Sequence, residues 1–162
     1  HMPNQKEIEE KLWSALKSDR TIMLALEGQK GGSSQPMTAV LEDDTRGPIW
    51  IFSASDVDLV EALGANVAPA VAQFVAKGHD LFASLHGTLR LHTETTTIER
   101  LWNPFIAAWY DGKRDPKLRL LRLDLDHAHV WLNEHSLLAG IKMKFGNDPR
   151  KDYKDKTADI SL

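Results

Sequence analysis

The feature that most constrains the fold is the run KLRLLRLDLDHAHVWLN at residues 117–133, in which leucines alternate with arginines, aspartates and histidines. Such alternation of apolar and polar residues is typical of a β-strand with one buried face and one polar face. The run therefore predicts one long strand. The rest of the chain has to supply its neighbours in a sheet.

The first half of the chain predicts a helix followed by closely spaced strands. Residues 5–18 carry four apolar residues at helical spacing, with acids early and lysines later, and they are Ile8, Leu12, Ala15 and Leu16. Short apolar runs bounded by turn residues predict three strands, at 21–28, 35–43 and 49–54. Their short connections favour an antiparallel meander. Pro36 indicates an edge or a bulge, because proline cannot donate to the ladder.

The second half predicts helices and strands in alternation. Residues 55–64 predict a short helix capped by Ser55 or Asp56 and stopped by a glycine. Two strands are expected next, at 67–78 and 80–92, with Gly87 as a bulge in the second. Further helices are expected at 95–110, begun by threonine caps and kinked by Pro104, and at 135–146. The polar tail after residue 146 is compatible with one terminal strand.

This order of elements predicts an α+β fold around an antiparallel sheet that is long enough to curl into a barrel. No repeat or domain boundary is visible, so residues 3–162 are expected to form one domain. The leading His-Met, residues 1–2, is interpreted as a cloning scar.

Composition narrows the classes of function. The chain contains no cysteine, which excludes disulfides, a thiol nucleophile and thiolate metal sites. A net charge of −3 and a pI near 6.2 argue against nucleic-acid binding and against binding to an anionic membrane. No apolar run is long enough to cross a bilayer and no signal peptide is visible, so a cytoplasmic protein is expected.

The stretch ERLWNPFIAAWYDGKRDP, residues 99–116, places Trp102 and Trp109 seven residues apart on one predicted helix. A spacing of seven returns to the same helical face, so packing against the sheet explains both tryptophans. The alternative is an aromatic wall beside a planar, anionic ligand. Lys113 and Arg114 follow directly, either as solvated turn residues or as partners of that anion.

Other candidate motifs are weaker. His127 and His129 alternate on one strand face, yet no third ligand stands at a suitable spacing, so no metal site is expected. Ser33 and Ser34 lack the surroundings of a nucleophile elbow. The glycines at 28–32 lack the Lys-Ser/Thr pair and the following helix of a phosphate-binding loop.

The order of several segments resembles the general-stress-protein branch of the pyridoxamine 5′-phosphate oxidase-like flavoproteins, over nearly the whole chain. The segments are TIMLAL, SSQPMTAV, PIWIFSASDVDLVEAL, FASLHGTLRL, IERLWNPFIAAWYDGKRDPKLRLLRLDLDHAHVW and KFGNDP. The most specific is LWNP, then an aromatic pair, Gly, a basic residue and Asp-Pro before a leucine-rich strand. The resemblance implies a split β-barrel with peripheral helices that forms a homodimer. It also implies FMN, or alternatively FAD, in two clefts between the subunits.

The resemblance also implies a set of cofactor-binding positions, with two departures from the family pattern. The set comprises Gln35, Pro36, Met37, Thr38, Phe52, Ser53, Ala54, Ser55, Leu59, Trp109, Lys113 and Arg114. Gln35 stands where the family has an arginine, and Leu59 falls where it has a phosphate-gripping lysine. Lys113, Arg114 or Arg119 could replace these cations, FAD could relax the need for them, or flavin affinity could be low. Trp109 is expected to face the cofactor of the neighbouring subunit.

The function implied is that of a flavin-binding protein, with a flavin-dependent oxidoreductase as one form and a non-catalytic flavin carrier or stress-linked binding module as the other. In such a site the cofactor carries the chemistry, while the protein binds and orients it. No residue stands out as an indispensable acid, base or nucleophile. The sequence therefore identifies neither catalytic residues nor a substrate.

Overall fold

The structure, a computed structural model, describes residues 3–29, 31–42, 46–134, 137–145 and 159–161. Its elements in chain order are α1 (Gln5–Asp19), β1 (Thr21–Leu26), the 3-10 turn η1 (Glu27–Gln29), β2 (Gln35–Thr38), β3 (Ile49–Ala54), α2 (Asp58–Leu63), β4 (Val67–Val75), β5 (Leu81–His92), α3 (Thr95–Leu101), α4 (Pro104–Ala107), β6 (Leu118–Glu134), β7 (Leu137–Lys144) and β8 (Asp159–Ser161).

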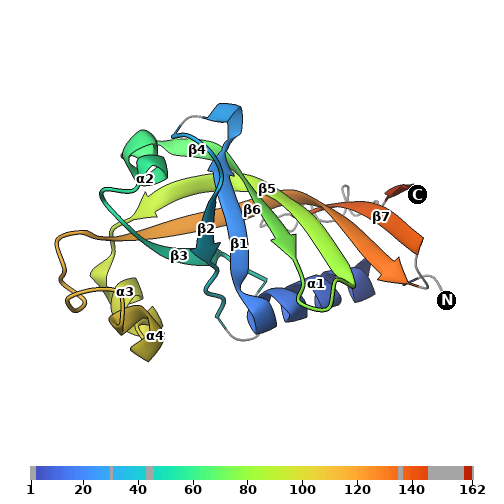
Figure 1. The fold of residues 1–162 in the computed structure, drawn as a ribbon, viewed down its shortest axis with the longest axis horizontal. Helices are drawn as coiled ribbons and strands as arrows, with labels where there is room; N and C mark the ends of the chain where they lie inside the picture. The colour runs from blue at the N-terminus through green and yellow to red at the C-terminus, as the bar shows by residue number, and fades with distance from the viewer. Residues whose placement is uncertain (1–2, 30, 43–45, 135–136, 146–158, 162) are drawn as a thin grey trace.

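The strands form one antiparallel sheet in the order β2-β1-β4-β5-β6-β7-β8, with β3 paired to β6 off this path (Figure 1). The long strand β6 pairs with β5 along one edge. It shares its other edge between β3, opposite residues 118–123, and β7, opposite residues 127–134. The α+β class and the antiparallel sheet are thus confirmed. No continuous closed barrel forms among the described strands, since one isolated bridge, Val40–Trp50, links the segment after β2 to β3.

Helix α1 covers one face of this sheet, as Figure 1 shows. Asn4 caps it by accepting a hydrogen bond from the Glu7 N–H at 2.9 Å. Ile8, Leu12 and Leu16 recur at four-residue intervals and are fully buried in the main core cluster. The predicted helix at 5–18 is confirmed, and its apolar stripe supplies the core with side chains that the sheet face alone cannot cover.

The predicted antiparallel meander of the first three strands is wrong. β1 and β2 form the expected hairpin, and Pro36 lies on β2 at the edge of the sheet, as expected. β3, however, pairs with β6 along its whole length. The reason is burial, because Ile49, Trp50 and Ile51 are all buried and a strand apolar on both faces cannot remain near an exposed edge.

The predicted helix at 135–146 is also wrong, because this segment contains strand β7. Ile141 and Met143 are buried while Lys142 and Lys144 are exposed, which is the two-residue period of a strand. Gly140 lies so close to the neighbouring strand that an added Cβ would be 2.5 Å from the His129 Nε2 atom. The open half of the β6 edge offers this segment a full ladder of hydrogen bonds, and that outweighs its weak helical propensity.

The predicted single helix at 95–110 is two helices, α3 and α4, separated by Trp102 and Asn103. Pro104 starts α4 because its ring cannot continue α3 and its missing N–H is harmless at a first helical position. Two predicted caps are corrected as well. Glu94 rather than a threonine precedes α3, and Val57 rather than Ser55 or Asp56 precedes α2.

Other local predictions are confirmed. The strands at 67–78 and 80–92 appear as β4 and β5, and the ladder between β5 and β6 shifts register at His86–Gly87. Gly87 is required there, because a Cβ would collide with the Asp124 carbonyl oxygen. A terminal strand is present as β8. Within the described residues, no helix has the length and apolar character needed to cross a membrane.

Candidate functional site

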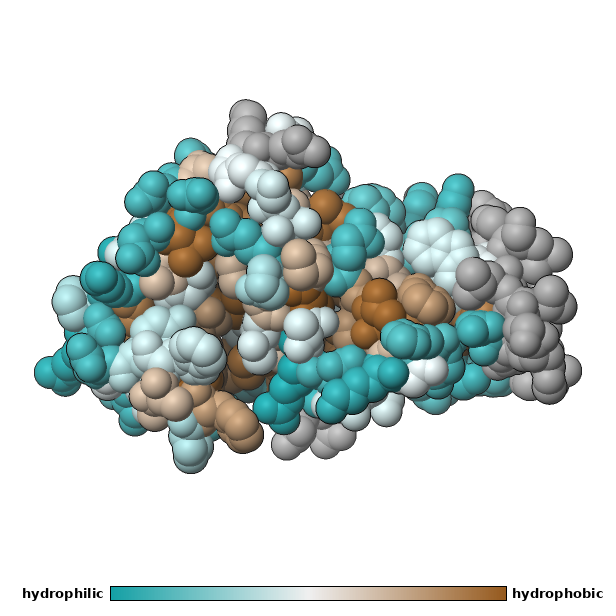
Figure 2. Space-filling view, in the orientation of Figure 1, coloured by the Kyte–Doolittle hydropathy of each residue, from teal (hydrophilic) through white to brown (hydrophobic). Residues whose placement is uncertain are grey.

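A cavity of about 870 Å³ opens where several segments meet at one end of the sheet. Ligand pockets in proteins typically measure about 300–1,000 Å³ and are mainly apolar. Figure 2 shows apolar side chains gathered on the lobe of α3 and α4 and a hollow beside it. The lining residues come from the α1–β1 junction (18–21), β2 and the residues after it (36–38 and 40), β3 (Phe52, Ala54), the turn after β4 (Lys77) and the segment from Asn103 to Tyr110.

The aromatic wall of the cavity is held in place by local contacts around α4. The Asn103 side chain caps α4 by accepting a hydrogen bond from the Ile106 N–H at 3.0 Å. The Trp102 ring meets the Phe52 ring edge to face, with centroids 6.2 Å apart. These contacts attach the segment to β3, so the side chains that follow Pro104 project from a fixed support.

The turn after this wall is ordered by a carboxylate. Asp115 accepts hydrogen bonds from the backbone N–H groups of Asp111 and Lys117, each at 2.9 Å. These hydrogen bonds lower the pKa of Asp115. Burial raises the pKa of Tyr110, and the nearby Asp115 carboxylate raises that pKa further. Tyr110 therefore presents a protonated phenol to the cavity at neutral pH.

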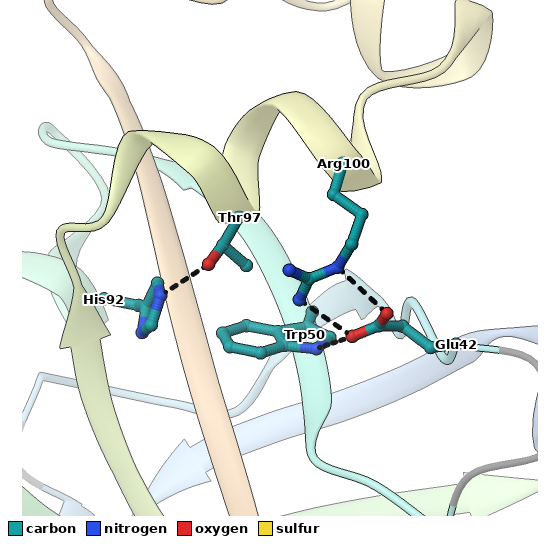
Figure 3. Close-up of polar contacts among 5 residues, drawn as sticks. All are labelled: Glu42, Trp50, His92, Thr97 and Arg100. Atoms are coloured by element: carbon teal, nitrogen blue, oxygen red, sulfur yellow. Dashed lines mark hydrogen bonds and ion pairs between the residues drawn. The ribbon is translucent and has the colours of Figure 1, made fainter.

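A polar cluster fastens α3 to the strands behind the cavity (Figure 3). The Arg100 guanidinium makes two hydrogen bonds of 3.0 Å to the Glu42 carboxylate, which also accepts the Trp50 indole N–H at 3.3 Å. The His92 Nε2 lies 2.9 Å from the Thr97 hydroxyl oxygen. Paired carboxylate–guanidinium contacts give directional support, so α3 is fixed on β3 and on the end of β5.

Burial lowers the pKa of His92, whose ring lies against the Trp50 ring with centroids 4.8 Å apart. The Glu94 carboxylate raises this pKa in part, while Arg122 lowers it further. The Arg122 guanidinium carbon lies 5.5 Å from the centroid of the Trp50 ring. The Arg122 cation therefore lies over the same Trp50 ring that contacts His92, and a second positive charge beside it is disfavoured. The cluster thus favours a neutral His92.

The cavity brings together half of the residues that the sequence singled out. Those that line it are Pro36, Met37, Thr38, Phe52, Ala54 and Trp109. They lie on β2, on β3 and after α4, which are distant in the chain. The β2 and β3 residues thus share one cavity with an aromatic wall from the segment LWNPFIAAWY.

The other singled-out residues lie outside this cavity lining. Ser53 is buried, the Ser55 N–H donates to the Lys117 carbonyl oxygen, and Gln35 lies on β2 opposite Leu24. Leu59 is only 1% exposed in the main core cluster, so its side chain faces away from solvent. Lys113 and Arg114 are exposed in the turn that follows the aromatic wall.

The two tryptophans occupy different environments, so the interpretation that places both on one helical face is wrong. Trp102 is half-buried against Phe52, whereas Trp109 is 83% exposed and lines the cavity. Phe105, also in the lining, is 80% exposed. Large aromatic rings left this exposed mark a surface suited to a ligand or a partner.

Ten of the lining residues were not singled out from the sequence, and three of them bear on the proposals below: Arg20, Lys77 and Tyr110. Arg20 ends α1 and Lys77 follows β4, so no local motif connects them. Tyr110 belongs to the aromatic pair of the quoted motif, and that adjacency was the available signal.

The histidines of β6 make stacking contacts. The His127 ring stacks on His86 with centroids 4.6 Å apart, and the His129 ring stacks on Trp131 at 3.8 Å. Burial lowers the pKa of His129, as does the Lys142 charge. Across the described ranges, no group of three or more His, Cys, Asp or Glu side chains is arranged to hold a metal ion. That the protein binds no metal stays a prediction.

Comparison with known proteins decides the family. Residues 7–152 match the family model described as pyridoxamine 5′-phosphate oxidase like. The chain belongs to this family. The resemblance drawn from the sequence motifs is thereby confirmed, and the family match covers every segment that lines the cavity. Among curated proteins, none matches the chain significantly.

Several solved structures are similar to this chain over nearly their whole length. A general stress family protein from Xanthomonas campestris pv. campestris is 54% identical, with a TM-score of 0.77, and the match covers 90% of this chain and 100% of that one. The general stress FMN/FAD binding protein from Xanthomonas citri is 55% identical, with a TM-score of 0.76 and coverage of 88% and 100%. General stress protein 26 from Jannaschia sp. CCS1, 24% identical with a TM-score of 0.72 and coverage of 98% and 99%, shares the fold.

Proposed function

We propose that this protein binds a flavin, FMN or alternatively FAD, in the cavity between β2, β3 and α4. The observation that carries the proposal is the joining of the β2 and β3 residues with exposed Trp109 in one cavity of about 870 Å³. Support comes from the Xanthomonas citri relative, which is named as an FMN/FAD binding protein at 55% identity.

The residues present fit the two halves of such a cofactor. Apolar and aromatic side chains, among them Met37, Phe52 and Trp109, suit a planar ring system. The protonated Tyr110 phenol and the Thr38 hydroxyl supply hydrogen-bonding groups at the same walls. Arg20 and Lys77, the two cations in the described lining, are available for the anionic end of the flavin.

A bound flavin would supply redox chemistry that no side chain of the protein can perform. The chain's own residues would hold the ring and shield it from water. They would also keep the Tyr110 proton in place at neutral pH. The proposed activity is flavin-dependent oxidation or reduction of a small substrate. A carrier that binds flavin without turnover is the second candidate, because no residue stands out from the sequence as an indispensable acid, base or nucleophile.

The proposed functional unit is a homodimer in which a split barrel completes the cleft. Trp109 and Phe105 are more than three-quarters exposed in the single chain, and a second copy would cover them. Light scattering at micromolar concentration should give twice the mass of the chain, and a monomer would refute this assembly. Location in the cytoplasm stays a prediction from the sequence.

The direct test of flavin binding is the purified protein itself. It should show flavin absorbance, and heat extraction followed by chromatography should identify FMN or FAD. Failure to bind either flavin on titration would refute the proposal. Anaerobic addition of NADH or NADPH then separates the two candidates, because an oxidoreductase should lose its flavin colour and a pure carrier should keep it.

A further inference from the structure

Two cations line the proposed flavin cavity at positions that no sequence motif indicates. They are Arg20 and Lys77. The positions where the resemblance implies phosphate-binding cations hold Gln35 and Leu59, which carry no charge. We propose that Arg20 and Lys77 together hold the phosphate of the flavin in this chain. This inference rests on the proposed flavin binding and identifies the residues that recognise the anionic end.

Arg20 is held at the cavity by an unusual backbone conformation. It caps the carboxyl end of α1 with a φ of 67°, in the left-handed region where glycine is the usual residue. Its N–H donates to the Leu16 carbonyl oxygen at 2.9 Å, and its own carbonyl accepts the Ala39 N–H at 2.6 Å. Glycine would adopt this conformation without strain, so an arginine here points to a use for its side chain.

The Arg20 side chain is oriented but not saturated. Its Nε donates to the Lys17 carbonyl oxygen at 3.1 Å. Across the described residues, its two terminal amino groups make no hydrogen bond and no ion pair. A guanidinium presents five N–H donors, and the free terminal pair suits two oxygens of one phosphate group.

Lys77 reaches the same cavity from the tight turn between β4 and β5. The Ala76 N–H donates to the Leu81 carbonyl oxygen, and the His79 N–H donates to the Ala76 carbonyl oxygen, each at 2.9 Å. These bonds fix the backbone on both sides of Lys77. Its ammonium has no acidic partner in the described part of the chain, so it contributes a second positive charge to the cavity that Arg20 also lines.

The small net positive charge of the cavity lining favours binding of an anion with moderate affinity. Asp19 is the one acid in the described lining, so the formal charge of the lining is +1. The carboxyl end of α1 also carries a partial negative charge that opposes an anion. By contrast, Lys113 and Arg114 are exposed in their turn and do not line the cavity.

The test titrates the flavin-free protein with FMN and with riboflavin, which carries the same ring system without the phosphate. In Arg20→Gly and in Lys77→Gln, the affinity for FMN should fall about tenfold, because a hydrogen bond to a charged group is lost. Riboflavin affinity should stay within about twofold of the parent's. Asp19→Asn should strengthen FMN binding, and added salt should weaken FMN binding in the parent but not riboflavin binding.

Arg20→Gly is the sharpest variant because it also relieves the left-handed strain, so its melting temperature should stay close to the parent's. Lys6→Gln, which removes an exposed cation at the other end of α1 and outside the cavity lining, is the matched control and should bind FMN normally. If the parent binds FMN and riboflavin equally well, or if the variants lose affinity for both flavins alike, the phosphate anchor is wrong while flavin binding stands. A parent that binds neither flavin refutes the proposed function itself.

Discussion

The contrast between Trp109 and Trp102 allows one experiment to separate binding from packing. Both tryptophans lie within the same eight-residue stretch, yet Trp109 is 83% exposed at the cavity and Trp102 is half-buried against Phe52. Replacing each in turn by alanine removes the same indole from two environments. We expect Trp109→Ala to weaken flavin binding with little effect on folding. Trp102→Ala is expected to lower the free energy of unfolding.

The magnitudes follow from burial. A buried aromatic side chain removes about 150–250 Å² from water, and each Å² contributes about 25 cal/mol. Less than a fifth of Trp109 is buried, so its truncation should cost about 1 kcal/mol of stability or less. The Trp102→Ala substitution removes a half-buried ring and its edge contact with Phe52, whose centroid lies 6.2 Å away. It should lower the free energy of unfolding by about 2–3 kcal/mol.

Binding should show the opposite order. An aromatic contact with a flavin ring contributes about 0.5–1.5 kcal/mol beyond burial, so Trp109→Ala should raise the dissociation constant about three- to tenfold. The assay is flavin titration by fluorescence quenching, with urea denaturation of both variants alongside. Trp109→Phe, which keeps an aromatic face, should recover most of the affinity. If Trp109→Ala binds flavin as tightly as the parent and unfolds normally, the exposed indole has no part in the site.

Three further predictions concern the framework behind the cavity. Burial lowers the pKa of His92 below its ordinary value of about 6.5, so the unfolded chain binds more protons as pH falls through that value. The free energy of unfolding should therefore be highest above about pH 6.5 and decline below it. Urea denaturation at several pH values should show a shallower decline in His92→Gln than in the parent. The same decline with pH in both proteins would contradict the assignment to His92. Gly87→Ala should cost about 3 kcal/mol or more, measured by thermal denaturation, since its Cβ would collide with the Asp124 carbonyl oxygen; near-parental stability would show that the bulge can relax. A double-mutant cycle on Glu42→Ala and Arg100→Ala should give a coupling of about 0.5–1 kcal/mol in urea denaturation, and no coupling would mean that solvent screens the pair.

Much of this protein could be predicted from short patterns in the chain. The apolar stripe of residues 5–18 forms α1, and the alternation at 117–133 forms β6. Gly87 lies at the register shift in the ladder between β5 and β6, and Pro36 lies on the edge strand β2. Both positions agree with the backbone preferences of glycine and proline. In each case the preference is local, because it depends on backbone sterics or on which face of one element is apolar.

Part of the candidate site was accessible in the same way. The motif around Trp109 and the segments of β2 and β3 were recognised by their order along the chain, and six of the predicted residues line one cavity. Arg20 and Lys77 were not accessible, because their place in one cavity depends on how the fold positions the end of α1 and the turn after β4. The position of a charged residue in the sequence does not indicate which groups it will lie near in the folded protein.

The tertiary structure alone decided which edges pair. Strand β3 pairs with β6 instead of β2, and the segment that was predicted to be helical forms β7. Both pair with β6 because the long edge of this strand has N–H and C=O groups that need hydrogen-bond partners. The same assembly separates Trp102, which packs on β3, from Trp109, which stays exposed at the cavity. Local patterns state what one element prefers, whereas pairing and exposure depend on what all the other elements leave open.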